Sequence, residues 1–372
     1  MKKKRLLAIA LLSLFATGCL NTDDDSGSDT TNTSSEISSE VSSESSVDSS
    51  SAESSSEEET LSITDFYPFE ESVFYSYIGD GNEFATFDRY PQYIEDNKIQ
   101  WTEVNPGATS VFVVEYADGQ LIETFREGNI YYRENMLDKT NDQAGRILLQ
   151  EPLEVGTAWE NPDGSTAEIT AVEMDVETTV GVFPAIEVTS TGETGVNKYY
   201  YAEDMGLIKQ TFGETADATL VSSTLQSRNA DMPQGITVKA FYPDANAMGL
   251  ETSDVSVSFF TNDVTRTTLT DLLKQVPDVE YGRLLPENAT INTLYLNDDG
   301  RVYVDFSEEL VTEMNAGSSG ESLILQGIVN TIGYFYGVEE IILTVEQAPY
   351  ESGHYIFQPG EPMFVNWGNV AE

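Results

Sequence analysis

The sequence predicts an α+β protein in which a mostly antiparallel β-domain precedes an α+β domain with two helices on a sheet. Three observations support this fold class. Residues 61–231 carry short runs of alternating apolar and polar residues, broken by Gly, Pro, Asn and Asp, as in β-strands. Residues 235–366 add two segments with apolar residues at helical spacing. Residues 1–60 divide into a short apolar run and an acidic, serine-rich tract, so they are expected to lie outside both domains.

The first 18 residues have the form of a secretory signal peptide. The basic residues 2–5 precede an apolar run over residues 6–15. As a helix this run is about 15 Å long, too short to cross a hydrocarbon core of about 30 Å. Residues 16–19 (ATGC) resemble a bacterial lipobox, although Ala16 stands where that motif usually has Leu. The resemblance implies cleavage after residue 18 and a diacylglycerol on Cys19; the alternative is an ordinary cleaved signal beside an unrelated thiol.

Cys19 is the sole cysteine of the chain, so no intrachain disulfide can form. Two acyl chains at this position would anchor the protein stably, whereas one would not. We therefore expect the protein outside the cytoplasm, lipid-anchored to the outer face of the cell membrane. Leu20 follows Cys19 without an acidic sorting residue, and a Gram-positive surface fits best.

Residues 19–60 are predicted to be a disordered linker. They consist mainly of Ser, Glu, Asp and Thr, which cannot bury enough apolar surface to offset the entropy of ordering. Between Arg5 and Arg89 the chain has no Lys or Arg, so the segment repels itself and extends. A spacer is the favoured interpretation; a tail that binds a cationic partner is the alternative.

The charge of the chain excludes some partners. It has 18 Lys and Arg against 64 Asp and Glu, a formal net charge of −46. No stretch is basic enough to follow a phosphate backbone, so nucleic acid is not expected as a partner. An anionic lipid surface is disfavoured for the same reason, which leaves the acyl group on Cys19 as the membrane contact.

Residues 61–231 are predicted to form the all-β domain. Hairpin turns are expected at residues 117–120 (ADGQ) and 202–206 (AEDMG). Residues 151–160 (EPLEVGTAWE), with the later runs FPAIEV and KYYYAEDMGLIK, resemble a curved β-domain of secreted bacterial lipoproteins. A sheet curled around an apolar cleft could hold an apolar molecule, but ordinary core and sheet surface is the favoured interpretation of the aromatic residues.

Residues 235–366 alternate strands and helices in the order β, β, α, β, β, α, β, which predicts helices on one face of a sheet. The first helix carries Leu269, Leu272, Leu273 and Val276 on one face, with Thr267 or Thr268 as its cap. Asn297-Asp298-Asp299-Gly300 joins the following hairpin.

Ser318 or Ser319 is expected to be the N-cap of the second helix, and Gly337 its C-cap. Its apolar stripe is Ile324, Ile328 and Phe335, together with Thr331. A nearly continuous apolar run follows as a buried last strand.

Residues 236–365 resemble the GerMN domain of sporulation and spore-germination proteins, which is also found in extracytoplasmic lipoproteins. The matching runs, in order, are VKAFYPD, LLKQVP, LPENATINTLYLNDDGRVYVDFSEEL, AGSSGES and QGIVNTIGYFYGVEEIILTVE. The run KQVPDVEYGRLLP departs from the family because it lacks a Gly-Pro after the first helix. The resemblance implies protein–protein assembly and no established catalytic chemistry.

The motifs of common enzymes and metal sites are missing from the sequence. His354 is the sole histidine, so a zinc cluster of the usual spacing is not expected. No G-x-S-x-G supplies a nucleophile for this histidine, and the acidic residues around Asp298 lack the EF-hand spacing. We therefore expect no enzyme, no cofactor and no metal site, and His354 is interpreted as part of a turn.

Five polar residues at strand and helix ends form the candidate partner contact: Asp305, Ser307, Ser318, Ser319 and Glu321. The alternative is that they only cap a turn and the second helix.

The sequence thus favours a non-catalytic, lipid-anchored protein whose GerMN-like domain binds another protein or itself at the cell envelope. The resemblance suggests sporulation or germination as the setting. A binding protein for a small apolar ligand or a wall glycan, acting through the β-domain, is the alternative. A wall hydrolase with paired carboxylates is a third hypothesis.

Overall fold

The computed structural model describes residues 61–141, 145–277 and 281–370. The predicted signal peptide, Cys19 and the acidic linker lie outside the described residues. The described residues all belong to one compact unit. Within the described ranges, no helix is long and apolar enough to span a membrane.

The first part of this unit is a twelve-stranded antiparallel sheet, in the order β6-β5-β4-β3-β2-β1-β12-β11-β10-β9-β8-β7. It consists of two meanders of six strands, joined where β1 pairs with β12. The strands are β1 (Phe74–Asp80), β2 (Phe87–Glu95), β3 (Lys98–Val104), β4 (Thr109–Ala117), β5 (Gln120–Gly128), β6 (Arg146–Gln150), β7 (Ala158–Glu160), β8 (Thr166–Thr178), β9 (Gly181–Gly192), β10 (Gly195–Ala202), β11 (Gly206–Gly213) and β12 (Val221–Asn229).

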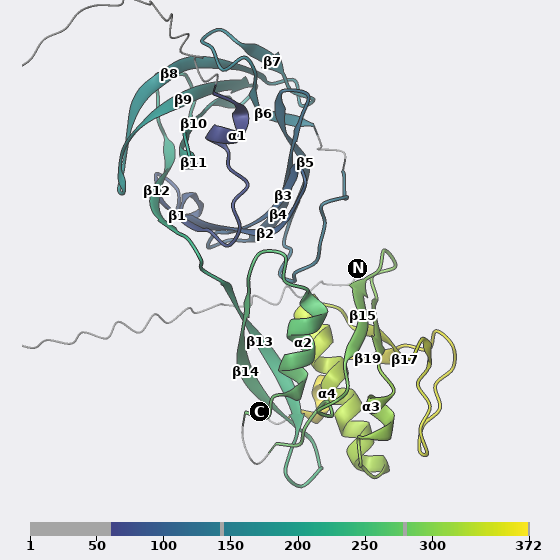
Figure 1. Ribbon diagram of the computed structural model, residues 1–372. Helices are drawn as coiled ribbons and strands as arrows, with labels where there is room; N and C mark the ends of the chain where they lie inside the picture. The colour runs from purple at the N-terminus through teal and green to yellow at the C-terminus, as the bar shows by residue number, and fades with distance from the viewer. Residues whose placement is uncertain (1–60, 142–144, 278–280, 371–372) are drawn as a thin grey trace, which may run out of the picture. The chain divides into compact units, whose positions relative to one another are not determined.

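The sheet curls around the short helix α1 (Ile63–Phe66), which lies inside it (Figure 1). A second short helix, η1 (Glu83–Ala85), links β1 to β2. The end strands β6 and β7 meet through side chains instead of a ladder of backbone hydrogen bonds. The backbone N–H of Ile147 donates to Asn161 Oδ1 at 2.9 Å, and Trp159 Nε1 donates to the Ile147 carbonyl at 3.0 Å.

The predicted hairpin turns are present. Asp118 and Gly119 have φ angles of 52° and 73° between β4 and β5, as a two-residue hairpin turn of the I′ type requires. Asp204 and Gly206 also have positive φ angles, between β10 and β11. These local signals were therefore correctly interpreted from the sequence.

Apolar side chains pack on both faces of the sheet. The inner face packs around α1, where Ile63, Phe66 and Tyr67 are buried. A smaller core lies on the outer face of β2–β5 and includes Tyr93 and Phe125. Ile130, Met136 and Leu137, from the chain after β5, cover it. The sheet therefore supports two separate apolar clusters.

The second part of the unit contains the predicted strands and helices in order, together with one short helix and two short strands that were not predicted. Its strands form two sheets instead of one. The strands β13 (Gln234–Pro243) and β14 (Leu250–Phe259) form a hairpin of their own. A second sheet has the order β15-β16-β17-β18, with β19 also paired to β17. Its strands are β15 (Ile291–Leu296), β16 (Val302–Phe306), β17 (Glu340–Val345), β18 (Ala348–Pro349) and β19 (Met363–Phe364).

The helices of this part are α2 (Thr265–Lys274), α3 (Glu309–Thr312) and α4 (Ser318–Tyr336), with a final turn η2 (Trp367–Asn369). β16 and β17 are parallel, because α3 and α4 form the crossover between them. α4 packs chiefly on β13 and also contacts β17. Leu325, Ile328, Val329, Ile332 and Phe335 form its buried face.

The ends of the helices are partly as predicted. Gly337 ends α4 with a φ of 71°, the left-handed conformation that favours glycine. The serine N-cap predicted for α4 is wrong, because the N-cap is Gly317 and Ser318 and Ser319 are already the first two residues of the helix. α2 begins at Thr265 after Val264. The threonine caps predicted for α2 are wrong, because the amide of Thr268 already donates to the Val264 carbonyl as part of the helix.

Arg133 connects the twelve-stranded sheet to the turn after β14. Its side chain is fully buried, and its guanidinium donates to the carbonyls of Gln92 (2.7 Å), Phe260 (3.0 Å) and Asp263. Burial lowers the pKa of this guanidinium. The Tyr93 hydroxyl accepts a further hydrogen bond at 3.0 Å. The charge is therefore held by backbone carbonyl dipoles and one phenol.

Candidate functional site

The five residues predicted as a partner contact do not form one cluster. Asp305 and Ser307, at the end of β16, are buried. Asp305 Oδ1 accepts hydrogen bonds from the Thr344 hydroxyl and the Gln347 amide, both at 2.7 Å. Ser307 Oγ accepts the Thr290 amide at 2.9 Å. Both side chains thus hold neighbouring strands and loops together in this conformation.

Ser318, Ser319 and Glu321 lie in the first turn of α4, where they differ in exposure. The two serines are exposed. Glu321 is buried. Only the two serines among the five predicted residues are therefore open to a partner in this structure.

Glu321 is the centre of a second polar cluster that the sequence did not predict. Its carboxylate accepts hydrogen bonds from the Tyr350 hydroxyl at 2.7 Å and the Ser352 hydroxyl at 2.5 Å. Nδ1 of His354 lies 2.5 Å from the other carboxylate oxygen. Burial tends to raise the pKa of Glu321, but hydrogen bonds from Ser352, His354 and Tyr350 outweigh it, and the pKa is lowered.

This cluster fastens the chain after β18 to the start of α4. Ser352 donates to Glu321, so its hydroxyl is not aligned on the imidazole as a triad nucleophile would be. His354 is 42% exposed, and its backbone amide donates to Ser352 Oγ at 3.0 Å. The geometry fits the interpretation of His354 as part of a turn. Among the described residues, no group of three His, Cys, Asp or Glu is placed to hold a metal ion.

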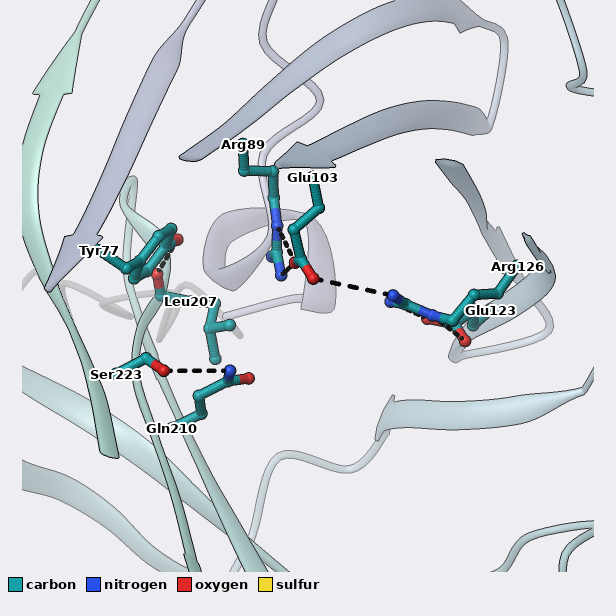
Figure 2. A network of polar contacts seen from close by, with 8 residues as sticks. All are labelled: Tyr77, Arg89, Glu103, Glu123, Arg126, Leu207, Gln210 and Ser223. Atoms are coloured by element: carbon teal, nitrogen blue, oxygen red, sulfur yellow. Dashed lines mark hydrogen bonds and ion pairs between the residues drawn. The ribbon is translucent and has the colours of Figure 1, made fainter. Parts of the chain in front are cut away.

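A third polar site lies inside the twelve-stranded sheet, where two arginines and two glutamates form a chain of ion pairs (Figure 2). Arg89 on β2 and Glu103 on β3 are direct cross-strand partners, with Nη2 2.6 Å from Oε2. Arg126 Nη1 lies 3.9 Å from the other oxygen of Glu103. Arg126 also binds Glu123 through Nε at 2.9 Å and Nη2 at 2.7 Å.

The electrostatics of this network follow from its burial. Removal from water tends to raise the pKa of Glu103, but the charges of Arg89 and Arg126 outweigh this effect, and the pKa is lowered. The pKa of Arg89 is raised, because Glu103 overcomes the desolvation of the guanidinium. Arg89 and Glu103 therefore stay ionised inside the sheet. Aromatic rings lie beside the network: Arg89 is 5.0 Å and Arg126 4.2 Å from the centre of the Phe112 ring.

The backbone explains how these charges come to face inward. Arg89 lies two residues from the buried Phe87, and Glu103 two residues from the buried Trp101, so each shares a face with an aromatic residue. A β-bulge opposite Val113 and Val114 turns Glu123 and Arg126, three residues apart, to the same side. The network was missed in the sequence, although the period-two spacing from the aromatic residues was a signal for half of it.

A small cavity lies beside Arg89. Its volume is about 10 Å³, room for about one water molecule. The indole N–H of Trp101 is buried there and has no hydrogen-bond partner among the described residues. Small-molecule sites typically measure about 300–1,000 Å³. Ile63, Phe66 and Tyr67 fill the interior of the sheet, and the cavity that remains is too small for a small apolar ligand.

The two-sheet part with its crossover helix is the region that comparison with known families identifies. Residues 239–351 match the Germane family, which is described as sporulation and spore germination. This segment is a Germane domain. The predicted resemblance to the GerMN family is thereby confirmed for this part of the chain, whereas the lipobox stays a prediction.

Several solved structures resemble parts of the chain. The first GerMN domain of the sporulation protein GerM from Bacillus subtilis aligns at 17% identity with a TM-score of 0.26, over 35% of this chain and 97% of that one. The tandem GerMN domains of the same protein align at 18% identity with a TM-score of 0.26, over 35% of this chain and 46% of that one.

A further similar structure is a Bacteroides fragilis protein described as exported and as having a YmcC-like fold. It aligns at 12% identity with a TM-score of 0.28, over 44% of this chain and 98% of that one. No curated protein matches the sequence.

Proposed function

We propose that the chain is a non-catalytic, lipid-anchored protein outside the cytoplasm whose Germane domain mediates protein–protein assembly at the cell envelope, in sporulation or germination. The observation that carries this proposal is the match of residues 239–351 to the Germane family. The signal-like start, with Cys19 as the site of the diacylglycerol, supports an extracytoplasmic, membrane-anchored position.

Exposed apolar side chains on the Germane domain support a role in binding. Met248 is 86% exposed, in the turn after β13, and Tyr295 on β15 is 45% exposed. The Tyr295 ring stacks on the Tyr303 ring, with their centres 5.5 Å apart. Aromatic residues and methionine are enriched at protein interfaces, so both positions are suitable for probing a contact.

In vivo photo-crosslinking tests the proposal. A benzoylphenylalanine in place of Met248 or Tyr295 should give discrete protein adducts in intact cells. Tyr131 in the chain after β5 and Val182 on β9, which are 56% and 61% exposed, are the control positions outside the Germane domain. An adduct of twice the mass of the chain would identify self-association. Adducts confined to the control positions, or absent everywhere, would contradict assembly through the Germane domain.

A further inference from the structure

The Germane domain contains a groove on the side of α3 and the start of α4. It lies between the chain segments 283–288 and 313–315, and its volume is about 390 Å³. Met314 and Ile324 contribute apolar surface to it, and the buried Leu284 lies beneath them. A space of this size falls within the range of about 300–1,000 Å³ typical of binding sites.

Internal contacts hold the two walls of the groove in place. Leu284 is buried and packs against α4 at Gly327, where an added Cβ would lie 2.6 Å from a Leu284 methyl carbon. The Asn288 side-chain amide donates to both carboxylate oxygens of Glu313, at 3.0 and 3.1 Å, and so links one wall to the other. The groove is therefore formed before any partner arrives.

The rim of the groove is mainly acidic. Glu287, whose side chain is 76% exposed, pairs with Arg283 at 3.0 Å, and Glu313 lies on the opposite wall. Residues 281–370 contain thirteen Asp and Glu against two arginines, so the surrounding potential is strongly negative. Such a field attracts and orients a cationic partner.

We propose that this groove binds a basic peptide segment of a protein partner. One apolar side chain of the segment packs on Met314 and Ile324, and flanking Lys or Arg residues pair with Glu287 and Glu313. Met314 suits such a contact, because an unbranched thioether adapts to side chains of different shape. The inference rests on the proposed function, since it assigns the partner-binding surface of the Germane domain.

Fluorescence anisotropy with designed peptides tests the inference on the purified full-length chain carrying Cys19→Ser. The probe is fluorescein-labelled Gly-Lys-Leu-Lys-Leu-Lys-Gly, and it is compared with versions in which Glu replaces Lys or Ser replaces Leu. We expect the first peptide to bind with a Kd on the order of 100 μM and both comparison peptides to bind at least about tenfold more weakly. Raising the salt from about 50 to about 300 mM should weaken binding further.

Matched variants locate the binding. Glu287→Lys with Glu313→Lys should weaken binding of the first peptide by about tenfold or more. Glu251→Lys with Asp271→Lys makes the same charge change at exposed positions outside the groove and should have little effect. Met314→Ser, which keeps the acidic rim, should also weaken binding. Circular dichroism confirms that each variant is folded.

Four outcomes would overturn the inference. The first is no binding at about 1 mM peptide, and the second is that the serine peptide binds as tightly as the leucine peptide. The third is that both pairs of charge variants lose the same affinity, and the fourth is that spermine displaces the probe while Met314→Ser leaves the affinity unchanged. The last outcome would indicate a small-cation site. If adducts at Met248 or Tyr295 persist in cells while the peptide fails to bind, the groove is wrong and assembly by the Germane domain stands.

Discussion

At the scale of single residues, the buried carboxylates of this protein are held by dense hydrogen bonding. Glu321 accepts two hydroxyl hydrogen bonds and lies beside His354, and Glu103 lies between two guanidinium groups. Burial alone would favour the protonated acid in both cases, so the lowered pKa values show that the partners prevail. The free energy of unfolding therefore depends on whether each of these carboxylates is charged.

Glu321→Gln tests this coupling. The folded pKa of Glu321 lies below its ordinary value, so the carboxylate contributes stability that is complete above the unfolded pKa and is lost as the pH falls through the folded pKa. Relative to the wild type, the variant should lose about 1–3 kcal/mol of unfolding free energy at neutral pH. The difference should shrink below about pH 4. Urea denaturation across this pH range measures it.

Glu251→Gln is the control for this experiment, because Glu251 is exposed on β14. It should show almost no difference from the wild type at any pH. A Glu321→Gln deficit that stays constant from neutral to acid pH would show that the carboxylate charge is not what stabilises the cluster.

At the scale of elements, α4 organises the Germane domain. It forms the crossover between β16 and β17, packs on β13 and carries Glu321 in its first turn. Its close approach to β13 depends on Gly327, where an added Cβ would lie 2.4 Å from the Phe241 carbonyl oxygen. Since Leu284 also packs there, the same glycine shapes one wall of the groove.

Gly327→Ala should destabilise the protein by about 1–3 kcal/mol, because a backbone carbonyl cannot yield as a flexible side chain can. Thermal unfolding followed by circular dichroism should show a lower Tm. Gly320→Ala is the matched control in the same helix: its Cβ would lie 3.4 Å from the Ala316 methyl carbon, and alanine is the better helix former. An unchanged Tm in Gly327→Ala would mean that α4 is less tightly packed than described.

The sequence predicted local features of these elements well and distant pairings poorly. The turn at Asp118–Gly119 and the end of α4 at Gly337 were identifiable because a positive φ leaves a local residue preference. The candidate site was less predictable. Asp305 and Glu321 proved to have separate sets of partners, and those partners, Gln347 and Ser352, lie 42 and 31 residues away in the chain. No local pattern specifies such pairs.

The division of the Germane strands into two sheets illustrates the same limit. The order of strands and helices was correctly predicted, because it follows from hydrophobic period and turn residues. Which strands pair depends on how α4 sits between β13 and β17, and this is settled by packing at positions such as Gly327. Sequence order alone does not contain that information.

At the scale of the whole molecule, the formal charge of −46 dominates the electrostatics. Like charges repel more strongly in the compact state than in the expanded unfolded chain, so folding carries an electrostatic cost that salt screens. Ion pairs such as Arg89–Glu103 are buried and therefore less sensitive to salt. The net effect of salt should be stabilising.

Raising NaCl from about 20 mM to about 500 mM should therefore increase the Tm by roughly 3–8 °C. Choline chloride at the same concentrations should give a similar increase, because screening does not depend on the identity of the cation. A Tm that falls with salt would show that exposed ion pairs outweigh the repulsion. A rise with NaCl alone would indicate bound sodium instead of screening.

The pairing of β1 with β12 has an architectural consequence. Phe74 and Asn229 are register partners, and the Met232 amide donates to the Ser72 carbonyl at 3.0 Å, so the chain enters and leaves the twelve-stranded sheet at one point. Neighbouring strands lie about 5 Å apart. The backbone that follows α1 into β1 and the backbone that leaves β12 for the Germane domain thus lie about one strand width apart, so a shift at either end of the sheet is felt at the other.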